Sequence, residues 1–346
     1  MNYKTLRIAF TAIVVVAMAV LIGYLFKETD VISIIERTDP KLLLGGAGLE
    51  VFGLFLYALS WHVLLISGGI KVKLRKSLVI TWSSLFLLYV TPAGILMDVS
   101  RAILMGKEGK NTSASTASVI MQRVLYAFAY VIVTTASIFV IYFYDRSRFH
   151  LIYPFIIIVM LAAAAGAFIL AASRHRGLVG WAANHFFNFY YKFIKKVGVD
   201  KRAKQKAQET TIQFSDAIVS MSNSPMGALL SLMIIVARLL VAALVSYWVF
   251  ISMNYYGINF WEITLVMLVG ELVTSIPLGV PGMLGFVEAA MSLSYVALGV
   301  PAGIAIAATL LIRLILYWWD VVVTGITAAL YSGGLKTFLR ASEQES

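Results

Sequence analysis

The chain has 346 residues, of which 60% are hydrophobic and 13% are charged, and its formal net charge is +11. Soluble globular proteins contain about 45–50% apolar residues, so this composition excludes a soluble fold and predicts an integral membrane protein. The chain contains no cysteine, which excludes disulfides and thiolate chemistry.

Six apolar stretches are each longer than the ~18 residues that suggest a membrane-spanning helix. In chain order they are Ile8 to Phe26, Leu42 to Gly68, Ser118 to Tyr144, His150 to Ser173, Met226 to Met253 and Gly303 to Leu330. The first stretch follows Lys4 and Arg7 but lacks a convincing small-residue cleavage site. We therefore interpret it as a retained signal anchor rather than as a cleaved signal peptide.

Two further apolar stretches, Ser77 to Met105 and Phe260 to Leu298, are each broken near the middle by proline and glycine. The breaks are TPAGILMD, which contains Pro92 and Gly94 and ends in Asp98, and VPGMLGFVE, which contains Pro281, Gly282 and Gly285 and ends in Glu288. Irregular backbone inside a membrane is tolerated only against protein or a water-filled cavity. Matching breaks in the two halves of a chain therefore indicate a transport site.

A basic segment separates the two halves. Between Arg174 and Lys206, nine basic residues are opposed by one acid, Asp200. The segment directly follows a predicted span and carries tryptophan and phenylalanine beside the basic cluster, which is typical of a helix in the lipid headgroup layer. We expect anionic lipid headgroups, and not nucleic acid, as its partner. A purely topogenic role for these charges stays open.

The loop charges orient the spans, because lysine and arginine are enriched on the cytoplasmic side. The N-terminus with Lys4 and Arg7, the loop at 71–76 and the C-terminus with Lys336 and Arg340 are predicted to be cytoplasmic. Each broken stretch must then begin and end on one face, the first on the cytoplasmic side and the second outside. The predicted fold is an all-α polytopic membrane protein with six transmembrane helices and two oppositely inserted re-entrant helical hairpins, arranged as an inverted-topology repeat.

This topology divides the chain into four parts and predicts a multi-pass protein of the cell membrane. The parts are a first membrane half (1–173, with hairpin 77–105), a basic amphipathic cytoplasmic linker (174–225), a second membrane half (226–332, with hairpin 260–299) and a cytoplasmic tail (333–346).

Charged residues within the apolar stretches test the repeat, since each costs about 2.5–3.5 kcal/mol on insertion scales and needs a reason to be there. Counted from Pro92 and Pro281, three pairs of charges fall at nearly equal distances. The pairs are Glu50 and Arg238 (42 and 43 residues before the proline), Asp98 and Glu288 (six and seven after it), and Arg123 and Arg313 (31 and 32 after it). Both halves thus carry charges at equivalent positions, with the sign reversed at the first.

An inverted repeat brings the two hairpin tips to a shared midplane cavity. Arginines there can hold a phosphate in a bidentate manner, and the half-helices after the breaks can direct their positive N-termini at an anion. The predicted substrate-binding residues are Arg123, Arg238, Arg313, Glu50, Asp98, Glu288 and Glu271. The alternative is that the arginines neutralise these acids or Asp320 in buried pairs. For Glu271, a helix-packing role with Thr274 or Ser275 stays open as well.

Arg101 and Glu262 lie near the expected interfaces, where we expect their side chains to reach toward water. The four histidines show no metal-ligand spacing, so we predict neither a metal nor another cofactor. The chain shows no nucleophile elbow, P-loop or zinc motif, so we predict no enzyme activity.

Four segments resemble the lysylphosphatidylglycerol synthase transmembrane region, also called the flippase-like domain family. They are DVSRAIL at 98–104, SVIMQRVLY at 118–126, VPGMLGFVEAAM at 280–291 and LLIRLILYWWDVVVTG at 310–325. With their spacing, the resemblance covers about residues 41 to 331. Gln122 stands where the family commonly has glutamate, and Leu96 and Met97 replace small residues. The resemblance implies translocation of lipids between leaflets, by a stand-alone member without the synthase domain.

We therefore predict a flippase that moves an anionic or headgroup-charged lipid, such as a phospholipid, glycolipid or polyprenyl phosphate, by alternating access at a midplane site. In this prediction Asp98 and Glu288 bind a headgroup amine or carry a coupling proton. The alternative is a membrane glycosyl- or acyltransferase acting on a lipid phosphate, with Asp98 as its candidate carboxylate. A third hypothesis is a scaffold in which all embedded charges are paired. A second copy of the chain and a lipid-biosynthesis protein remain open as partners.

Overall fold

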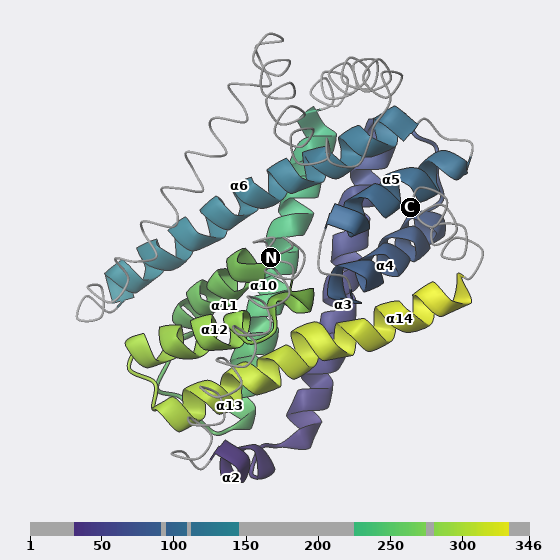
Figure 1. The fold of residues 1–346 in the computed structure, drawn as a ribbon. Coiled ribbons are helices and arrows are strands. Elements are labelled where there is room, and N and C mark those ends of the chain that lie inside the picture. Colours follow the sequence, from purple (N-terminus) through teal and green to yellow (C-terminus); the bar gives the residue numbers. More distant parts are fainter. Residues whose placement is uncertain (1–30, 91–94, 109–111, 145–224, 275–279, 332–346) are drawn as a thin grey trace, which may run out of the picture.

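The computed structural model describes residues 31–90, 95–108, 112–144, 225–274 and 280–331, and the regular structure within these ranges is entirely helical (Figure 1). In chain order the helices are α2 (Val31–Glu36), α3 (Pro40–Ser67), α4 (Leu74–Val90), α5 (Ile95–Lys107), α6 (Thr112–Tyr144), α10 (Pro225–Ser252), α11 (Phe260–Thr274), η3 (Pro281–Met283), α12 (Phe286–Ala297), α13 (Ala302–Arg313), η4 (Leu314–Trp319) and α14 (Asp320–Leu330). The predicted spans at 8–26 and 150–173, the basic linker, and the breaking residues Pro92 and Gly94 lie outside the described residues.

Four helical segments are long and apolar enough to cross a membrane. They are Pro40–Ser67, Ala114–Phe143, Pro225–Ser252 and Ala302–Leu330, which match four of the six predicted spans. The 28 residues of α3 would extend about 42 Å at 1.5 Å per residue, more than the ~30 Å of a hydrocarbon core. The chain is therefore a polytopic membrane protein, as its composition predicts.

Each broken stretch forms two helices that are too short to cross a bilayer alone. Helices α4 and α5 have 17 and 13 residues, and α11 and α12 have 15 and 12, where a span needs about 20. The two helices of each pair pack against each other. An ion pair of 2.7 Å between Lys76 and Glu108 joins the beginning of α4 to the end of α5, so that both ends of the first pair lie together.

The two halves repeat the same order of elements, a long helix, a pair of half-length helices and a second long helix. The contacts between the halves are reciprocal as well. Helix α6 packs on α11, the first helix of the other half's pair, and α14 correspondingly packs on α4. In Figure 1, α6 and the continuous α13–η4–α14 segment lie on opposite sides of the central helices. The two halves are thus built alike.

Helices α3 and α10 form the centre of the molecule and run antiparallel (Figure 1). The backbone N–H of Asp39 donates to the carbonyl of Ser252, at 3.0 Å, so the beginning of α3 lies beside the end of α10. Toward the other end, the hydroxyl of Ser231 donates to the carbonyl of Ser60, also at 3.0 Å. Because α3 and α10 are equivalent elements, the two halves are related by a reversal of chain direction.

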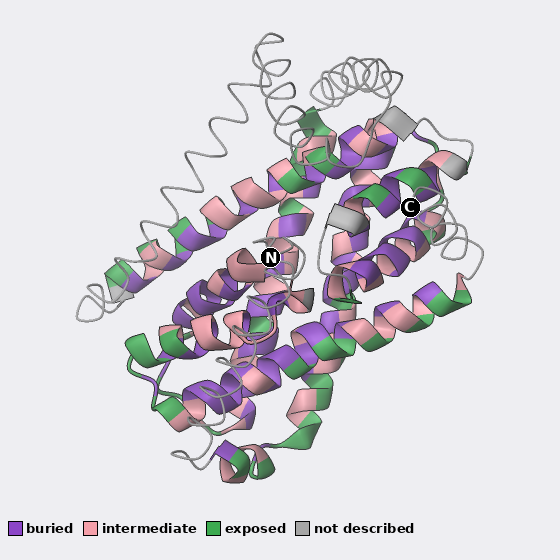
Figure 2. Ribbon diagram, in the orientation of Figure 1, coloured by how far each residue is buried: buried purple, intermediate pink, exposed green. Residues whose placement is uncertain are grey.

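Small residues allow this close central packing, as is common between membrane helices. Gly46 of α3 lies against Val245 and Ile315, and Gly53 lies against the guanidinium of Arg238. Figure 2 shows buried residues along the faces where the helices meet. Large apolar side chains such as Leu293 (64% exposed) and Phe139 (63% exposed) lie on outer surfaces, which suits contact with lipid tails.

Candidate functional site

The six charges at equivalent positions of the two halves are all paired with one another. The pairs are Arg238 Nη2 to Glu50 Oε1 at 2.6 Å, Arg123 Nε to Asp98 Oδ2 at 2.9 Å and Arg313 Nε to Glu288 Oε1 at 2.7 Å. The first pair joins the two halves, because α3 carries Glu50 and α10 carries Arg238. The other two pairs lie within one half each. The structure thus brings together six of the seven predicted substrate-binding residues as three ion pairs.

The two pairs within the halves have the same construction. In each, the acid lies in the first turn of the second short helix, α5 or α12, and the arginine lies on the long helix that follows. The acid precedes the arginine by 25 residues in both, and both arginines donate through Nε. Asp98–Arg123 and Glu288–Arg313 are therefore the same structural feature, present once in each half.

Asp98 has a second arginine partner that the sequence analysis assigned to the interface. Arg101 Nη2 donates to Asp98 Oδ1 at 2.6 Å, and its Nη1 donates to Gln122 Oε1 at 2.7 Å. Its guanidinium lies 5.2 Å from the ring of Trp61, and its side chain is fully buried. The prediction that Arg101 reaches toward water is wrong, because Asp98 and Gln122 supply acceptors for its buried guanidinium. The amide of Gln122 also donates to Ser60, at 2.8 Å.

In the second half, the ion pair holds the glycine-rich break in place. Glu288 Oε2 accepts from the backbone N–H of Gly285, at 2.6 Å, and so caps the N-terminus of α12. Arg313 Nη2 donates to the carbonyl of Gly282, at 2.8 Å, and its guanidinium lies over the ring of Tyr317, 4.2 Å from the centroid. The carboxylate of Glu288 therefore already occupies the helix end that the sequence analysis proposed for a bound anion.

Gly282 cannot be replaced without strain. Its φ of 57° lies in the left-handed region, and a Cβ built there would lie 2.2 Å from the ring of Tyr317. The hydroxyl of Tyr317 in turn donates to the carbonyl of Tyr89, at 3.0 Å, where α4 ends. The end of α4 also packs on η3, which contains Gly282. The described residues beside the two breaks, at the end of α4 and in η3, therefore lie against each other, as we expect for an inverted repeat.

The two equivalent pairs differ in accessibility. The side chains of Arg123 and Asp98 are 47% and 24% exposed, whereas those of Arg313 and Glu288 are 9% and 11% exposed. One construction is therefore more exposed in the first half, where we call it the open pair, than in the second, where we call it the closed pair.

A buried carboxyl group adjoins the Glu50–Arg238 ion pair, which joins the two halves. Asp320, the first residue of α14, is fully buried, as is Glu50, and its carboxyl group lies within hydrogen-bonding reach of that of Glu50. Its Oδ2 accepts from the hydroxyl of Tyr89 at 2.8 Å. The sequence left Asp320 open as a partner of the embedded arginines, but Arg313 pairs with Glu288 instead.

Glu271 and Glu262 lie on α11 but in different surroundings. Glu271 is half-buried and accepts from the hydroxyl of Tyr130 at 3.4 Å, while Thr274 bonds to the backbone of its own helix. Glu262 is fully buried, and it exchanges hydrogen bonds of 2.9 and 3.0 Å with Asn259 at the beginning of α11. The prediction that the side chain of Glu262 reaches toward water is therefore wrong, because this side chain is buried and caps α11.

Tyr89, Tyr317 and Gln122 contact the site but were not predicted as part of it. Tyr89 lies three residues before Pro92, and Tyr317 lies one turn after Arg313. Polar aromatic residues so close to a break or to an embedded charge were the available signal. Such residues often carry a buried hydroxyl that needs a partner.

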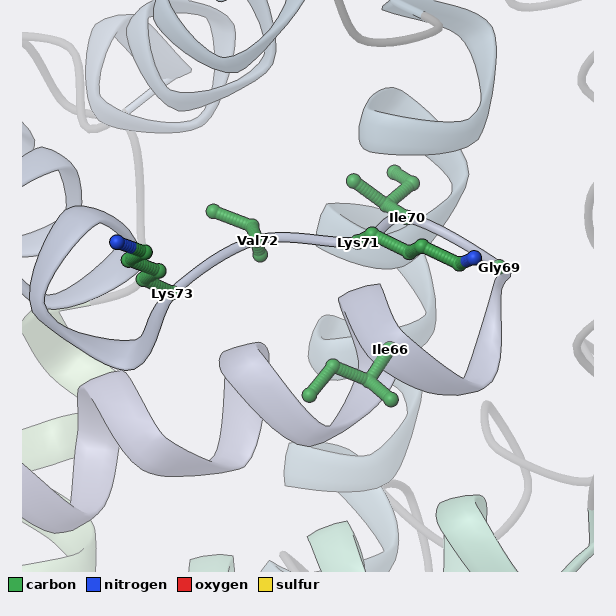
Figure 3. Close-up of a pocket in the computed structure, with 6 residues that line it drawn as sticks. All are labelled: Ile66, Gly69, Ile70, Lys71, Val72 and Lys73. Carbon is green, nitrogen blue, oxygen red and sulfur yellow. The ribbon is translucent and has the colours of Figure 1, made fainter.

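A hollow of about 500 Å³ lies apart from these charges, at the loop between α3 and α4 (Figure 3). It is lined by Ile66, Gly69, Ile70, Lys71, Val72 and Lys73. Apolar side chains and two lysines share this loop, which the sequence analysis placed on the cytoplasmic side. Among the described residues, no three histidine, cysteine or acidic side chains are grouped as metal ligands.

Comparisons with known proteins identify the family of the chain. The family model described as the lysylphosphatidylglycerol synthase TM region matches residues 8–324. Two UPF0104 membrane proteins of Methanothermobacter thermautotrophicus are 25% and 24% identical to the chain; each alignment covers 96% of it, and 94% and 97% of the relatives. No solved structure matches the chain. The chain therefore belongs to the family of the lysylphosphatidylglycerol synthase transmembrane region.

Proposed function

We propose that the protein moves a lipid with an anionic or charged headgroup between the two leaflets of the cell membrane by alternating access. In this proposal both termini are cytoplasmic, and the two helix pairs are re-entrant hairpins that enter from opposite faces. The reversed direction of the two halves and the meeting of the hairpin ends support it. These features are typical of transporters built from inverted repeats.

The observation that carries the proposal is the difference between the two equivalent ion pairs. In an inverted repeat, the halves exchange conformations as the site opens to one face and then to the other. An open Asp98–Arg123 pair and a closed Glu288–Arg313 pair are what one end state of such a cycle requires. In the opposite state, the second pair would be open and the first closed.

The open pair suits a lipid headgroup. A guanidinium has five N–H donors, and Arg123 gives its Nε to Asp98. Its exposed end can bind a phosphate in a bidentate manner, while the neighbouring carboxylate of Asp98 attracts a headgroup amine. The acyl or polyprenyl tails stay in the bilayer, against the apolar outer surfaces. Lys71 and Lys73 of the α3–α4 hollow and the basic segment at 174–206 attract anionic headgroups at the cytoplasmic surface.

The experiment is lipid translocation in proteoliposomes that carry a fluorescent anionic phospholipid. We expect Arg123→Gln to slow translocation about tenfold or more, since a hydrogen bond to a charged group contributes about 1.5–3 kcal/mol. Arg123→Lys should keep part of the activity. Arg37→Gln is the matched control, because Arg37 is exposed and lies outside the site. Unchanged translocation in both Arg123→Gln and an Arg313→Gln/Glu288→Gln double variant would refute the site.

The geometry disfavours the transferase alternative. Both oxygens of Asp98 accept from arginines, so neither oxygen of this carboxylate is left unengaged for a reacting group. The scaffold alternative predicts paired charges, as observed, but it does not account for an accessible Arg123. Product formation from a labelled donor by the purified protein would support the transferase.

A further inference from the structure

We propose that Glu50 and Asp320 form a proton-binding site at the centre of the protein, in which the two carboxyl groups hold one proton between them. The proton site stands on its own geometry. Its use in coupling rests on the proposed transport function.

The hydrogen bonds of Asp320 carry the argument. Its Oδ2 accepts from Tyr89, whereas its Oδ1 is buried and receives no hydrogen bond from any described residue. The carboxyl group that lies within hydrogen-bonding reach is that of Glu50. Two ionised carboxylates have only acceptors to offer each other, so a hydrogen bond between them requires a proton.

The charges around the pair require this proton as well. The titratable groups that face it are Arg238 of α10, Glu271 of α11 and Tyr89 of α4. Behind them, Tyr126 of α6 faces Arg238, and Tyr317 of η4 contacts Tyr89. Arg238 is the cation of this set, and both of its terminal nitrogens donate to Glu50. With Glu50 thus neutralised, an ionised Asp320 would be a fully buried second anion, which is very costly.

Placing the proton on Asp320 Oδ1 satisfies every group. The hydroxyl of Tyr89 donates to Oδ2, and both terminal nitrogens of Arg238 donate to Glu50. A protonated Oδ1 would then donate to Glu50. Each hydrogen bond in this series then has one donor and one acceptor. The orphaned oxygen of Asp320 becomes the donor that the arrangement lacks.

Glu50 and Asp320 lie next to the segments that would move during transport. Asp320 directly follows the π-helical turn η4, which begins after Arg313 of the closed pair. It also binds Tyr89 at the end of α4, beside the first break. Loss of the proton would place two carboxylates against each other between α3 and α14, and so would weaken the contact between the two halves.

The test is infrared spectroscopy of the purified full-length protein, followed by thermal unfolding at several pH values. We expect a carbonyl band of a protonated carboxyl group that persists at neutral pH, where exposed acids are ionised. Asp320→Asn, which keeps one donor and one acceptor, should abolish the band. Glu108→Gln, which changes an exposed acid, should leave it unchanged.

The proton is held by the folded state and not by the unfolded state at neutral pH, so the unfolding temperature should fall as the pH rises toward release. This fall should be absent in Asp320→Asn. Absence of the band in the wild-type protein at neutral pH would overturn the proposal without any variant. So would identical pH profiles for the wild type and Asp320→Asn. A protein that shows the band but moves no lipid would keep the proton site and refute the proposed function.

Discussion

The guanidinium of Arg313 is used on three sides, whereas that of Arg123 is largely free to reach outward. Arg313 donates to Glu288 and to the carbonyl of Gly282, and its face covers the ring of Tyr317. Arg123 makes the equivalent bond to its acid but is 47% exposed. Two arginines at equivalent positions therefore have different roles. Arg313 stabilises the second break, and Arg123 remains accessible.

This difference predicts unequal effects on stability. We expect Arg313→Gln to destabilise the protein by about 3–5 kcal/mol, because it leaves the carboxylate of Glu288 buried without its cation. Arg123→Gln should cost about 1 kcal/mol or less, since the pair is partly exposed and Asp98 keeps Arg101. Thermal unfolding of the two variants in the same detergent measures this. Equal losses of unfolding temperature would contradict the assignment of a closed and an open pair.

The positions of the embedded charges could be predicted from the sequence more readily than their binding partners. Membrane-embedded charges are few, so their positions and spacing from Pro92 and Pro281 predicted the equivalent sites. Their pairing depends on side-chain rotamers and on helices far apart in the chain, so the sequence analysis left a phosphate and a buried acid as alternatives for each arginine. The burial of Arg101 escaped prediction because its acceptor, Gln122, lies on another helix.

The crossing of helices α3 and α10 explains why the first pair of equivalent charges, Glu50 and Arg238, has opposite signs. Two equivalent helices that run antiparallel bring equivalent residues together at their crossing point. Glu50 and Arg238 are equivalent, and they bind each other there. Gly53 provides the room, since a Cβ at this position would lie 2.7 Å from Nη1 of Arg238. Like charges at this position would repel each other in a buried site.

A charge exchange tests this account. Arg238→Glu would place a third acid beside Glu50 and Asp320, and Glu50→Arg would oppose two arginines, so each single variant should lose about 3–5 kcal/mol. The double variant restores an ion pair and should recover more than half of the lost unfolding temperature. The matched control is the exchange of Lys76 and Glu108, a pair that is 36% and 37% exposed, for which single and double variants should differ little. An additive loss in the Glu50→Arg/Arg238→Glu protein would exclude the pairing.

Helix boundaries were predictable where composition changes sharply. The predicted span Met226 to Met253 corresponds to α10 at Pro225–Ser252, because proline and polar loop residues flank it. The π-helical turn η4 could not be foreseen, since LILYWW contains neither proline nor glycine. Such turns are rare overall but frequent at functional sites, and this one places Tyr317 against Tyr89 and Gly282.

At the scale of the whole molecule, the absence of cysteine makes the proposed topology directly measurable. Single cysteines at Lys71 and Glu108 should react with an impermeant maleimide only from the cytoplasmic side. Cysteines at Tyr256 and Ala302 should react only from outside, because both ends of the second hairpin are proposed to lie there. The unmodified chain is the control for background labelling. Opposite labelling of Tyr256 and Ala302 would show that the second broken stretch crosses the membrane.

The overall class of the fold followed from composition, and the reciprocal packing of α6 on α11 and α14 on α4 did not. Hydropathy identifies apolar helices but carries no information about which of them touch. The spacing of the charges indicated only which elements of the two halves are equivalent, and not which helices contact each other.

The ion pair between Glu50 and Arg238 also bears on how such a molecule can be assembled. Two identical copies of one half would bring two glutamates, or two arginines, to the buried crossing point of α3 and α10. A symmetric homodimer of half-length chains is therefore incompatible with this centre. The two halves can combine only as unlike partners, and their fusion into one chain guarantees that each glutamate meets an arginine.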